Sequence, residues 1–426
     1  MKKVLLGTTA LIAATFASHA ARADDSPVKL GISGIAQFAY GVDVSQKGHS
    51  NNGFGSISKI SSDQLPDGMK TYANLDISGD AKFKNGLTAG AFIEFSAQPQ
   101  ATGSAGGTTQ VKQDWVHLLG DSFGEVRMGD QTDARRAKGM AAPSWSPNYF
   151  LNANSPDIAF IGSGAATNTT TAWMGNRYMT SIAYFSPTFD GAQLSVSYAP
   201  DNGTFSNAGP GSGVTAANGL YGVGKTFLRD VFSGAISWSG TVSGFTINAE
   251  GGMTTASTKK NAVETVSGLA ATSNPFIWDG GFSVGYGPWL VGAAFEQTSN
   301  LKNGYGSGLN PEEVDKNLDV GFTYTIGNLT TGVEWSRGIY EGGIAATVGG
   351  PATNTSADPK SHFTLDTITP GATYVIGPGV DVEAGVAYNV VHGSGYDATG
   401  FTGSASGAGQ TRGQEIVLEF GTEVKF

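Results

Sequence analysis

Apolar and polar residues alternate one by one along most of this 426-residue chain. In the final stretch, 413–426, Ile416, Leu418 and Phe420 fall on one parity, whereas Glu415 and Glu419 fall on the other. Such a period of two places the two sets on opposite faces of a β-strand. The same alternation predicts sixteen strands, near 28–42, 71–83, 87–95, 110–119, 124–130, 177–185, 192–199, 226–238, 245–253, 276–286, 289–297, 316–326, 329–337, 363–376, 380–390 and 413–426.

The connections between these strands are short and long in turn. The first short one contains Asn85-Gly86, and an Asn-Gly pair between alternating runs is a strong signal for a tight hairpin. The other short connections lie near 120–123, 186–191, 239–244, 287–288, 327–328 and 377–379. The long ones are 43–70, 96–109, 131–176, 200–225, 254–275, 298–315, 338–362 and 391–412. Because the number of strands is even, both termini are expected on the side of the short turns.

The two faces of the strands are compatible with two fold classes. In a soluble sandwich the apolar face packs into a core, whereas in a transmembrane barrel it faces lipid and the polar face lines water. The polar parity carries many carboxylates, which a wet lumen and a soluble surface tolerate equally: Glu94, Glu125, Glu250, Asp279, Glu296, Asp319, Glu334, Asp381, Glu383 and Glu419. Charge alone therefore does not separate the two classes.

Aromatic residues collect at the two ends of the strands and do separate them. The ends beside the short turns carry Phe83, Tyr184, Trp238, Phe245, Tyr286, Trp289, Tyr324, Tyr374 and Phe426. The opposite ends carry Tyr40, Phe95, Tyr178, Trp278, Phe295, Trp335 and Tyr388. Two belts of aromatic residues, one on each side of an aliphatic band, are typical of membrane interfaces. We therefore predict an all-β fold, a 16-stranded antiparallel transmembrane β-barrel with short periplasmic turns and long extracellular loops.

The amino terminus has the features of a secretory signal peptide. Two lysines precede an apolar run, and Ala21-Arg22-Ala23 is a small-x-small cleavage site, so residues 1–23 are expected to be removed and 24–426 to form the barrel. Removal leaves 22 of the 25 basic residues against 35 acidic ones, a formal charge of −13 that argues against a nucleic-acid partner. The chain has no cysteine, which excludes disulfides and thiol-bound metals.

Two stretches and the last residue resemble a known family. WVHLLGDSFGEVRMGD at 115–130 and NRYMTSIAYFSPTFDGAQLSVSYAP at 176–200 are similar to stretches of Gram-negative general porins. Phe426 resembles the carboxyl-terminal signal by which the barrel assembly machinery recognises members of that family. The resemblance implies a homotrimer in the cell outer membrane, in which each barrel is a water-filled pore for passive diffusion of small hydrophilic solutes and ions. It also implies that the third long loop, here 131–176, folds inward and narrows the pore.

In this family, basic wall residues face an acidic inner loop at the constriction. Asp133 and Asp157 are the clear acidic members of the loop here, and Glu94 and Glu125 are carboxylates on the strands. The basic candidates are Arg127 on the strand 124–130, Arg135, Arg136 and Lys138 at the entrance to the loop, and Arg177 at its exit. For each arginine, a salt bridge that only anchors the loop is the alternative interpretation.

The second strand departs from the family pattern in a way that bears on ion selectivity. Where family members carry arginines, it offers Asn74, Asp76 and Asp80. Inward carboxylates then outnumber inward cations, and at physiological salt only charges within about 8 Å interact strongly. We therefore expect a weak preference for cations.

Small outward residues on the first three strands suggest where the trimer contact lies. These residues are Gly34, Ala36, Gly79, Ala81, Ala89 and Ala91. Small side chains let backbones approach closely, so these strands, with the last one, are the expected oligomer interface. Loop carboxylates Glu312, Glu313 and Asp315 could bridge lipopolysaccharide through divalent cations, although a solvated acidic patch is the commoner outcome.

Other functions find less support in the sequence. The histidines have no metal-ligand spacing and no nucleophile motif is present, so neither an enzyme nor a cofactor is expected. A substrate-specific channel for sugars or anions would carry a file of inward aromatics, and the inward aromatics are few, chiefly Phe92 and Phe185. The strand 110–119 is apolar on both parities, which leaves open whether it lies beneath the inward loop or at the oligomer contact.

Overall fold

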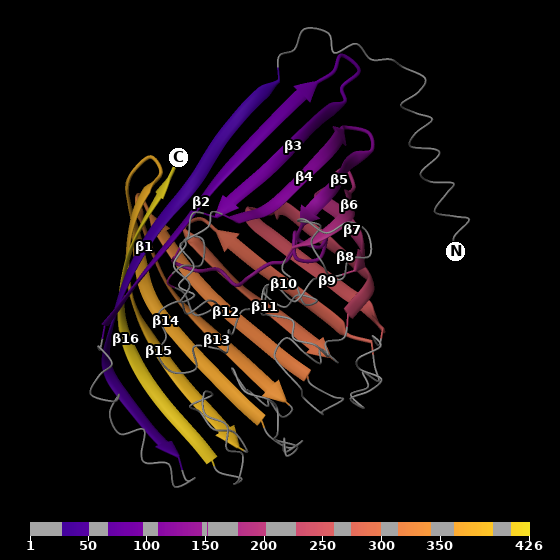
Figure 1. Ribbon diagram of the computed structural model, residues 1–426. Helices are drawn as coiled ribbons and strands as arrows, with labels where there is room; N and C mark the ends of the chain where they lie inside the picture. The colour runs from indigo at the N-terminus through magenta and orange to yellow at the C-terminus, as the bar shows by residue number, and fades with distance from the viewer. Residues whose placement is uncertain are drawn as a thin grey trace.

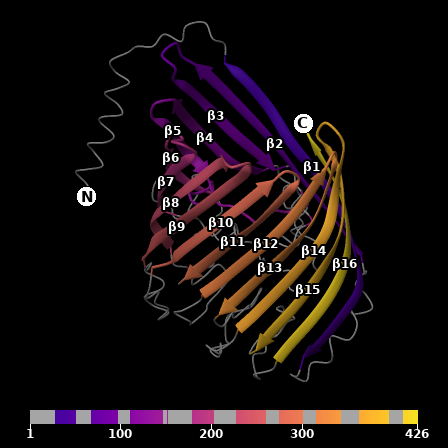
Figure 2. The same ribbon diagram turned by 180° about the vertical axis from the view of Figure 1, so that it is seen from behind.

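The protein is a closed β-barrel. The computed structural model describes residues 28–50, 67–96, 110–146, 151, 178–201, 227–259, 274–299, 314–341, 362–394 and 410–426. Each strand pairs antiparallel with its sequence neighbours, and β1 pairs with β16 to close the barrel (Figure 1, Figure 2). The strands are β1 Lys29–Ser50, β2 Asp67–Lys82, β3 Thr88–Ser96, β4 Gln110–Gly120, β5 Gly124–Gln131, β6 Met179–Phe185, β7 Ala192–Asp201, β8 Phe227–Val242, β9 Phe245–Lys259, β10 Phe276–Tyr286, β11 Trp289–Ser299, β12 Val314–Ile326, β13 Leu329–Glu341, β14 His362–Gly377, β15 Val380–Ser394 and β16 Gln410–Lys425. The predicted sixteen-stranded antiparallel barrel is confirmed.

The polarity of the two faces is that of a membrane barrel. On β16, Glu415 and Glu419 are buried inside the barrel, whereas Phe420 and Val424 are 49% and 40% exposed on the outside. Nine of the ten carboxylates predicted on the polar parity are buried in the interior, and Glu125 is half-buried. Only a closed sheet satisfies every backbone group in hydrocarbon, which explains why an apolar exterior accompanies a barrel without edges. Among the described residues, no helix is long and apolar enough to cross a bilayer.

The aromatic residues of the predicted belts lie on the outer surface. At the short-turn end, Phe245 contacts Tyr286 and Trp289 contacts Tyr324, with ring centroids 4.8 Å and 4.3 Å apart. Such contacts between neighbouring strands are typical of the aromatic girdles that lie at the level of the lipid headgroups. β1 begins and β16 ends at this same end of the barrel (Figure 1), as an even strand number requires. The predicted signal peptide, residues 1–23, lies outside the described residues.

The strands extend beyond their predicted bounds at the ends with the long connections. β1 continues to Ser50 and β9 to Lys259, because backbone pairing persists above the bilayer, where both faces of a strand are wet and no alternation is needed. At the other end, β8 reaches Val242, so its turn is Ser243-Gly244 rather than 239–244. Both turn residues have positive φ, 52° and 85°, which is the backbone of a type I′ hairpin.

The last residue completes the closure of the barrel. The backbone N–H of Phe426 donates to the carbonyl of Gly34 at 3.1 Å, and the N–H of Gly34 donates to the carbonyl of Phe426 at 2.9 Å. The ring of Phe426 lies over Gly34, where a Cβ would stand only 2.5 Å from the ring and 2.6 Å from the carbonyl oxygen of Asn74. A glycine at position 34 is therefore what allows the terminal aromatic ring to seat on the outside of β1.

We expect Gly34→Ala to weaken the seam between β1 and β16 by about 1–3 kcal/mol, the usual cost of overpacking a tight contact. The measurement is unfolding in urea of the purified barrel in lipid vesicles, followed by the mobility shift between folded and unfolded protein on a gel. Gly79→Ala is the matched control, because its Cβ would meet only side-chain atoms of Leu30 and Val28 at 3.5 Å. Equal unfolding midpoints for the two variants would contradict a tight seat for Phe426.

Candidate functional site: the pore constriction

A strand-free segment, residues 132–146, crosses the interior of the barrel (Figure 1). It leaves the end of β5 at Gln131 and contacts lumen-facing residues of β7 through β12, β14 and β15. Leu151, the next described residue, packs with Ala39 of β1 and Val417 of β16. This inner segment therefore lies along more than half of the barrel wall and narrows the lumen.

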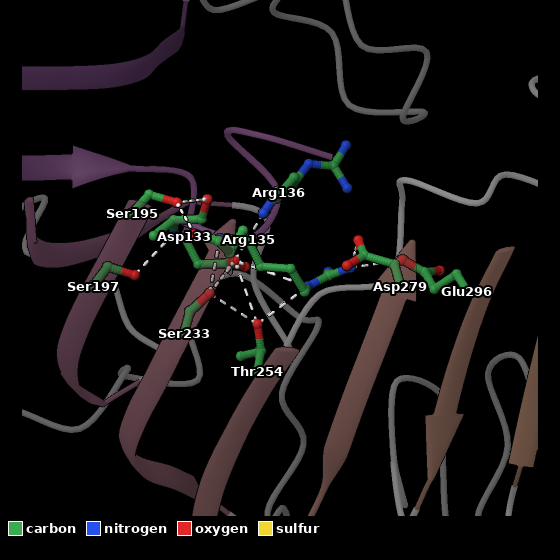
Figure 3. Close-up of polar contacts among 11 residues, drawn as sticks. Asp133, Arg135, Arg136, Ser195, Ser197, Ser233, Thr254, Asp279 and Glu296 are labelled. Carbon is green, nitrogen blue, oxygen red and sulfur yellow. Dashed lines mark hydrogen bonds and ion pairs between the residues drawn. The ribbon is translucent and has the colours of Figure 1, made fainter. Parts of the chain in front are cut away.

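The entrance of the inner segment is held by Arg135, whose side chain is completely buried. Its guanidinium donates to Asp279 on β10 at 2.6 Å, to Glu296 on β11 at 2.9 Å and to Thr254 on β9 at 3.1 Å (Figure 3). Asp133 lies 4.0 Å from the Arg135 Nε atom. One planar cation thus ties the segment to three neighbouring strands, as the fork of an arginine permits. We call Asp133 and Arg135 the first anchor.

Hydroxyl groups on two strands complete the first anchor (Figure 3). The backbone N–H of Ala134 donates to Ser197 and that of Arg135 donates to Ser233, both at 2.9 Å. Ser233 in turn donates to the carboxylate of Asp133 at 2.7 Å. These contacts satisfy backbone groups that would otherwise be buried without a partner, which is costly.

The electrostatics of the first anchor favour a permanently charged arginine. Burial by itself would lower the pKa of Arg135, but the charges of Asp133, Asp279 and Glu296 raise it well above its usual value. A buried cation is stable only when anions compensate it, so the three carboxylates and the arginine depend on one another.

Trp145 and Ser146 form a second anchor at the other end of the inner segment. The indole N–H of Trp145 donates to the carbonyl of Thr369 at 2.8 Å, and the Thr373 hydroxyl donates to the carbonyl of Trp145 at 2.6 Å. The Ser146 hydroxyl donates to Glu383 at 2.6 Å. Trp145 is 1% exposed. The inner segment is therefore fastened to β9–β11 at one end and to β14–β15 at the other.

Lumen-facing glycines make room for the inner segment between and beneath the anchors. A Cβ on any of seven glycines would collide with Arg135, Met140, Pro143, Trp145 or Leu151; the seven are Gly252, Gly281, Gly292, Gly321, Gly371, Gly385 and Gly421. At Gly321 the Cβ would overlap the backbone of Pro143, and at Gly371 and Gly385 it would overlap the ring of Trp145. Close approach of another backbone is one of the few physical reasons for a glycine within a strand.

The opposite wall carries a row of aromatic rings and cations. Phe92 on β3 stacks on Trp115 on β4, with centroids 4.2 Å apart. The guanidinium of Arg127 on β5 lies 5.2 Å from the centroid of Trp115 and 4.6 Å from that of Phe185 on β6. The ammonium of Lys138, from the inner segment, lies 5.5 Å from the Phe185 centroid. We call Phe92, Trp115, Arg127, Phe185 and Lys138 the aromatic–cation row.

Carboxylates on the same wall are paired with bases. Glu125 accepts two hydrogen bonds from Arg127, at 2.7 Å and 2.9 Å. Glu94 accepts from Asn74 at 2.7 Å and from Gln113 at 2.6 Å. The ammonium of Lys112 lies 3.5 Å from Glu94. Glu94 and Glu125 therefore each have a basic side chain beside them.

The sequence matches a family model described as Gram-negative porin over residues 7–394. The chain belongs to the Gram-negative porin family. An anion-selective porin from Comamonas acidovorans has a similar fold, with a TM-score of 0.55 at 15% identity over 94% of this chain and 100% of that chain. The outer membrane channel DcaP of Acinetobacter baumannii matches at 0.54 and 14% identity, over 95% and 99%. The in-vitro folded trimer form of OmpT from Vibrio cholerae matches at 0.52 and 10% identity, over 94% and 100%. No curated protein sequence matches the chain.

Family and fold together make this protein an outer-membrane transport channel of a Gram-negative bacterium. In this porin, the residues predicted for the constriction occupy two different environments. Arg127 and Glu125 lie half-exposed on the wall, with side chains 28% and 20% exposed. Arg135 and Asp133 are buried in the first anchor, which is the anchoring alternative that the sequence left open. Asp157 and Arg177 lie outside the described residues.

The structure also shows the positions of Arg136, Glu94 and the strand β4. The side chain of Arg136 points away from the first anchor, while its backbone N–H donates to Asp133 at 3.0 Å (Figure 3). Glu94 lies in the interior and is 8% exposed. Trp115 of β4 faces the lumen, and Val116 is 51% exposed on the outside. The inward face of β4 is therefore apolar because it contributes Trp115 to the aromatic–cation row.

Sequence reasoning missed the second anchor and the glycines beneath it. Trp145 is one of two tryptophans in the third long loop, and a large aromatic residue in a loop rich in small and polar residues was a usable signal for an inward contact. The seven glycines gave no such signal, because the chain has 63 glycines.

Proposed function

We propose that this porin is a homotrimeric general diffusion pore for small hydrophilic solutes and ions, with a weak preference for cations. The observation that supports this best is the inner segment, which is fastened at both ends across a closed barrel with a polar interior. Such an arrangement leaves a water-filled passage of fixed cross-section and requires no moving part. The proposal is of a channel and not of an enzyme.

The weakness of the cation preference follows from where the carboxylates lie. The most deeply buried ones, such as Glu296 and Asp319, are 0% exposed and line the wall of β9 to β16 that the inner segment follows. On the described part of β2–β6, Lys112 lies beside Glu94 and Arg127 pairs with Glu125, whereas Asp76 and Asp80 on β2 add further carboxylates. Screening limits the influence of more distant charges.

The trimer would form through the outer face of β1–β3. This face carries the small residues predicted for the contact, among them Ala36 and Ala91, which are exposed. Solved structures of similar fold include a trimer form of OmpT from Vibrio cholerae. The roles of Phe426 as a signal for the barrel assembly machinery and of the loop carboxylates as lipopolysaccharide contacts are part of the same proposal.

A planar-bilayer recording under a potassium chloride gradient tests the proposal. We expect insertion in triple conductance steps and a small reversal potential of the sign for cation preference. Arg127→Ala should leave the charge of Glu125 uncompensated and raise the cation-to-anion permeability ratio roughly twofold, since a half-exposed charge contributes on the order of 0.5 kcal/mol. Lys29→Ala, a charge change outside the constriction, is the control. An unchanged reversal potential for Arg127→Ala would remove this residue from the constriction.

A substrate-specific channel is the second candidate, and one observation favours it. The sequence predicted few inward aromatics, but Trp115 joins Phe92 and Phe185 on one wall. Three aromatic rings in one row give solutes a flat apolar surface that a purely polar lumen lacks.

A further inference from the structure

The aromatic–cation row spans five neighbouring elements of the barrel. Phe92, Trp115, Arg127 and Phe185 come from β3, β4, β5 and β6, and Lys138 comes from the inner segment. Each member touches the next, at 4.2 Å, 5.2 Å, 4.6 Å and 5.5 Å. A solute passing between the inner segment and this wall therefore meets aromatic rings and cations side by side.

The row has more cation than anion. Arg127 and Lys138 supply two positive charges, and Glu125 supplies one negative charge. Lys138 donates to the amide oxygen of Gln193, which is neutral. Burial and the nearby charge of Arg127 lower the pKa of Lys138 from its usual value, so the two cations are close enough to repel each other. An added anion between them would relieve that repulsion.

Hydrogen-bonding capacity in the row is also one-sided. Within the described structure, Arg127 uses its Nε and Nη2 atoms on Glu125, and Lys138 uses one of its three N–H groups on Gln193. A guanidinium carries five N–H donors and an ammonium three, and neither group accepts. The row therefore presents donors to the lumen, which suits a carboxylate better than a cation.

The other bases of this wall do not combine these features, since Lys112 lies 4.5 Å from the centroid of the Tyr72 ring but has Glu94 beside it. Lys112 donates to Tyr72 and Asn74, both at 2.8 Å, and lies 3.5 Å from Glu94. His117 lies 3.1 Å from Asp80. Excess positive charge, spare donors and adjoining ring surface coincide only at the row, within the described part of this wall.

We propose that the aromatic–cation row is a weak binding site for small aromatic carboxylates, monoanions with one planar ring. The carboxylate binds between Arg127 and Lys138, and the ring packs against Trp115 and Phe92. Apolar contact and charge then act together, so acetate, which lacks a ring, binds more weakly than benzoate. The inference rests on the proposed pore function, because the solute reaches the row only through an open lumen.

The test is block of single-channel potassium chloride current by benzoate added to the full-length protein in planar bilayers. Benzoate should reduce the current with a half-blocking concentration at least several-fold below that of acetate or of neutral benzyl alcohol. Trp115→Ala and Lys138→Gln should each raise that concentration roughly three- to tenfold, in line with aromatic and exposed-charge contacts. Trp115→Phe should keep most of the block.

Lys112→Gln is the matched control, because it also removes one lysine charge from the lumen, but outside the row. Equal block by benzoate and acetate, no block at all, or equal effects of Lys138→Gln and Lys112→Gln would each overturn the binding site. Absence of any potassium chloride conductance in the wild-type protein would instead contradict the proposed pore function, so the two failures are distinguishable. Folding of each variant is checked by its heat-dependent mobility shift on a gel.

Discussion

Arg135→Met is expected to release the entrance of the inner segment from the wall. The substitution removes a fully buried cation shared by Asp133, Asp279 and Glu296. Removing one partner of a buried ion pair costs about 3–5 kcal/mol, because a charge stays buried without its counter-charge. If this free energy destabilises the state in which the inner segment is bound to the wall, the ratio of wall-bound to detached segment falls by about two to three and a half orders of magnitude.

Single-channel recording measures this change. Wild-type channels should show one steady conductance, whereas Arg135→Met channels should spend much of the time in a larger, noisier conductance state. Arg135→Lys should be intermediate, because an ammonium cannot reproduce the planar fork that joins two carboxylates and Thr254.

Two further variants separate charge from bulk at this position. Arg136→Met is the matched control, since the neighbouring side chain points away from the first anchor (Figure 3). Adding Asp279→Asn and Glu296→Gln to Arg135→Met should recover part of the wild-type conductance, because no uncompensated charge from these strands then remains. A wild-type record for Arg135→Met would show that the first anchor does not hold the segment.

Gly371→Leu is expected to displace the second anchor. A Cβ at this position already overlaps the ring of Trp145, and the larger leucine side chain leaves no room for the indole. Trp145 is buried, and losing its packing costs about 3–5 kcal/mol, as for truncation of a buried tryptophan. The conductance should rise as the segment leaves β14 and β15.

A double-mutant cycle with Trp145→Ala provides the control for this prediction. Trp145→Ala removes the indole, so Gly371→Leu should add little further effect in a Trp145→Ala background, and a double-mutant cycle should give strong coupling between the two sites. Gly285→Ala is the matched control, because its Cβ would meet neighbouring atoms at 3.5 Å or more. Additive effects of Gly371→Leu and Trp145→Ala would contradict direct contact.

In the family pattern that the resemblance implied, basic wall residues face an acidic loop at the constriction. Among the described residues, the entrance of the inner segment carries Arg135, Arg136 and Lys138 together with Asp133, and the wall behind it carries two carboxylates that Arg135 binds. The acidic wall of β10 and β11 thus serves to hold the loop, and the aromatic–cation row on the opposite wall is left to meet the solute.

The sequence alone determined the architecture of this porin. Sixteen strands, the side of each strand that faces lipid and the alternation of short and long connections all followed from a period of two and from the position of aromatic residues. These signals are local, since a residue in a transmembrane strand faces either lipid or lumen whatever the rest of the chain does. The predicted bounds differ from the observed ones at strand ends, as at Ser50 of β1 and Val242 of β8, where alternation is no longer required.

Only the tertiary structure decided which polar residues meet the solute. Arg127 and Arg135 are alike in the sequence, but one lies half-exposed on the wall and the other is buried against Asp279 and Glu296, which are 144 and 161 residues further along the chain. Likewise, Trp145 seats on glycines more than 200 residues away. Burial, pairing and close approach depend on which distant strands the inner segment crosses, and no local pattern of residues records that path.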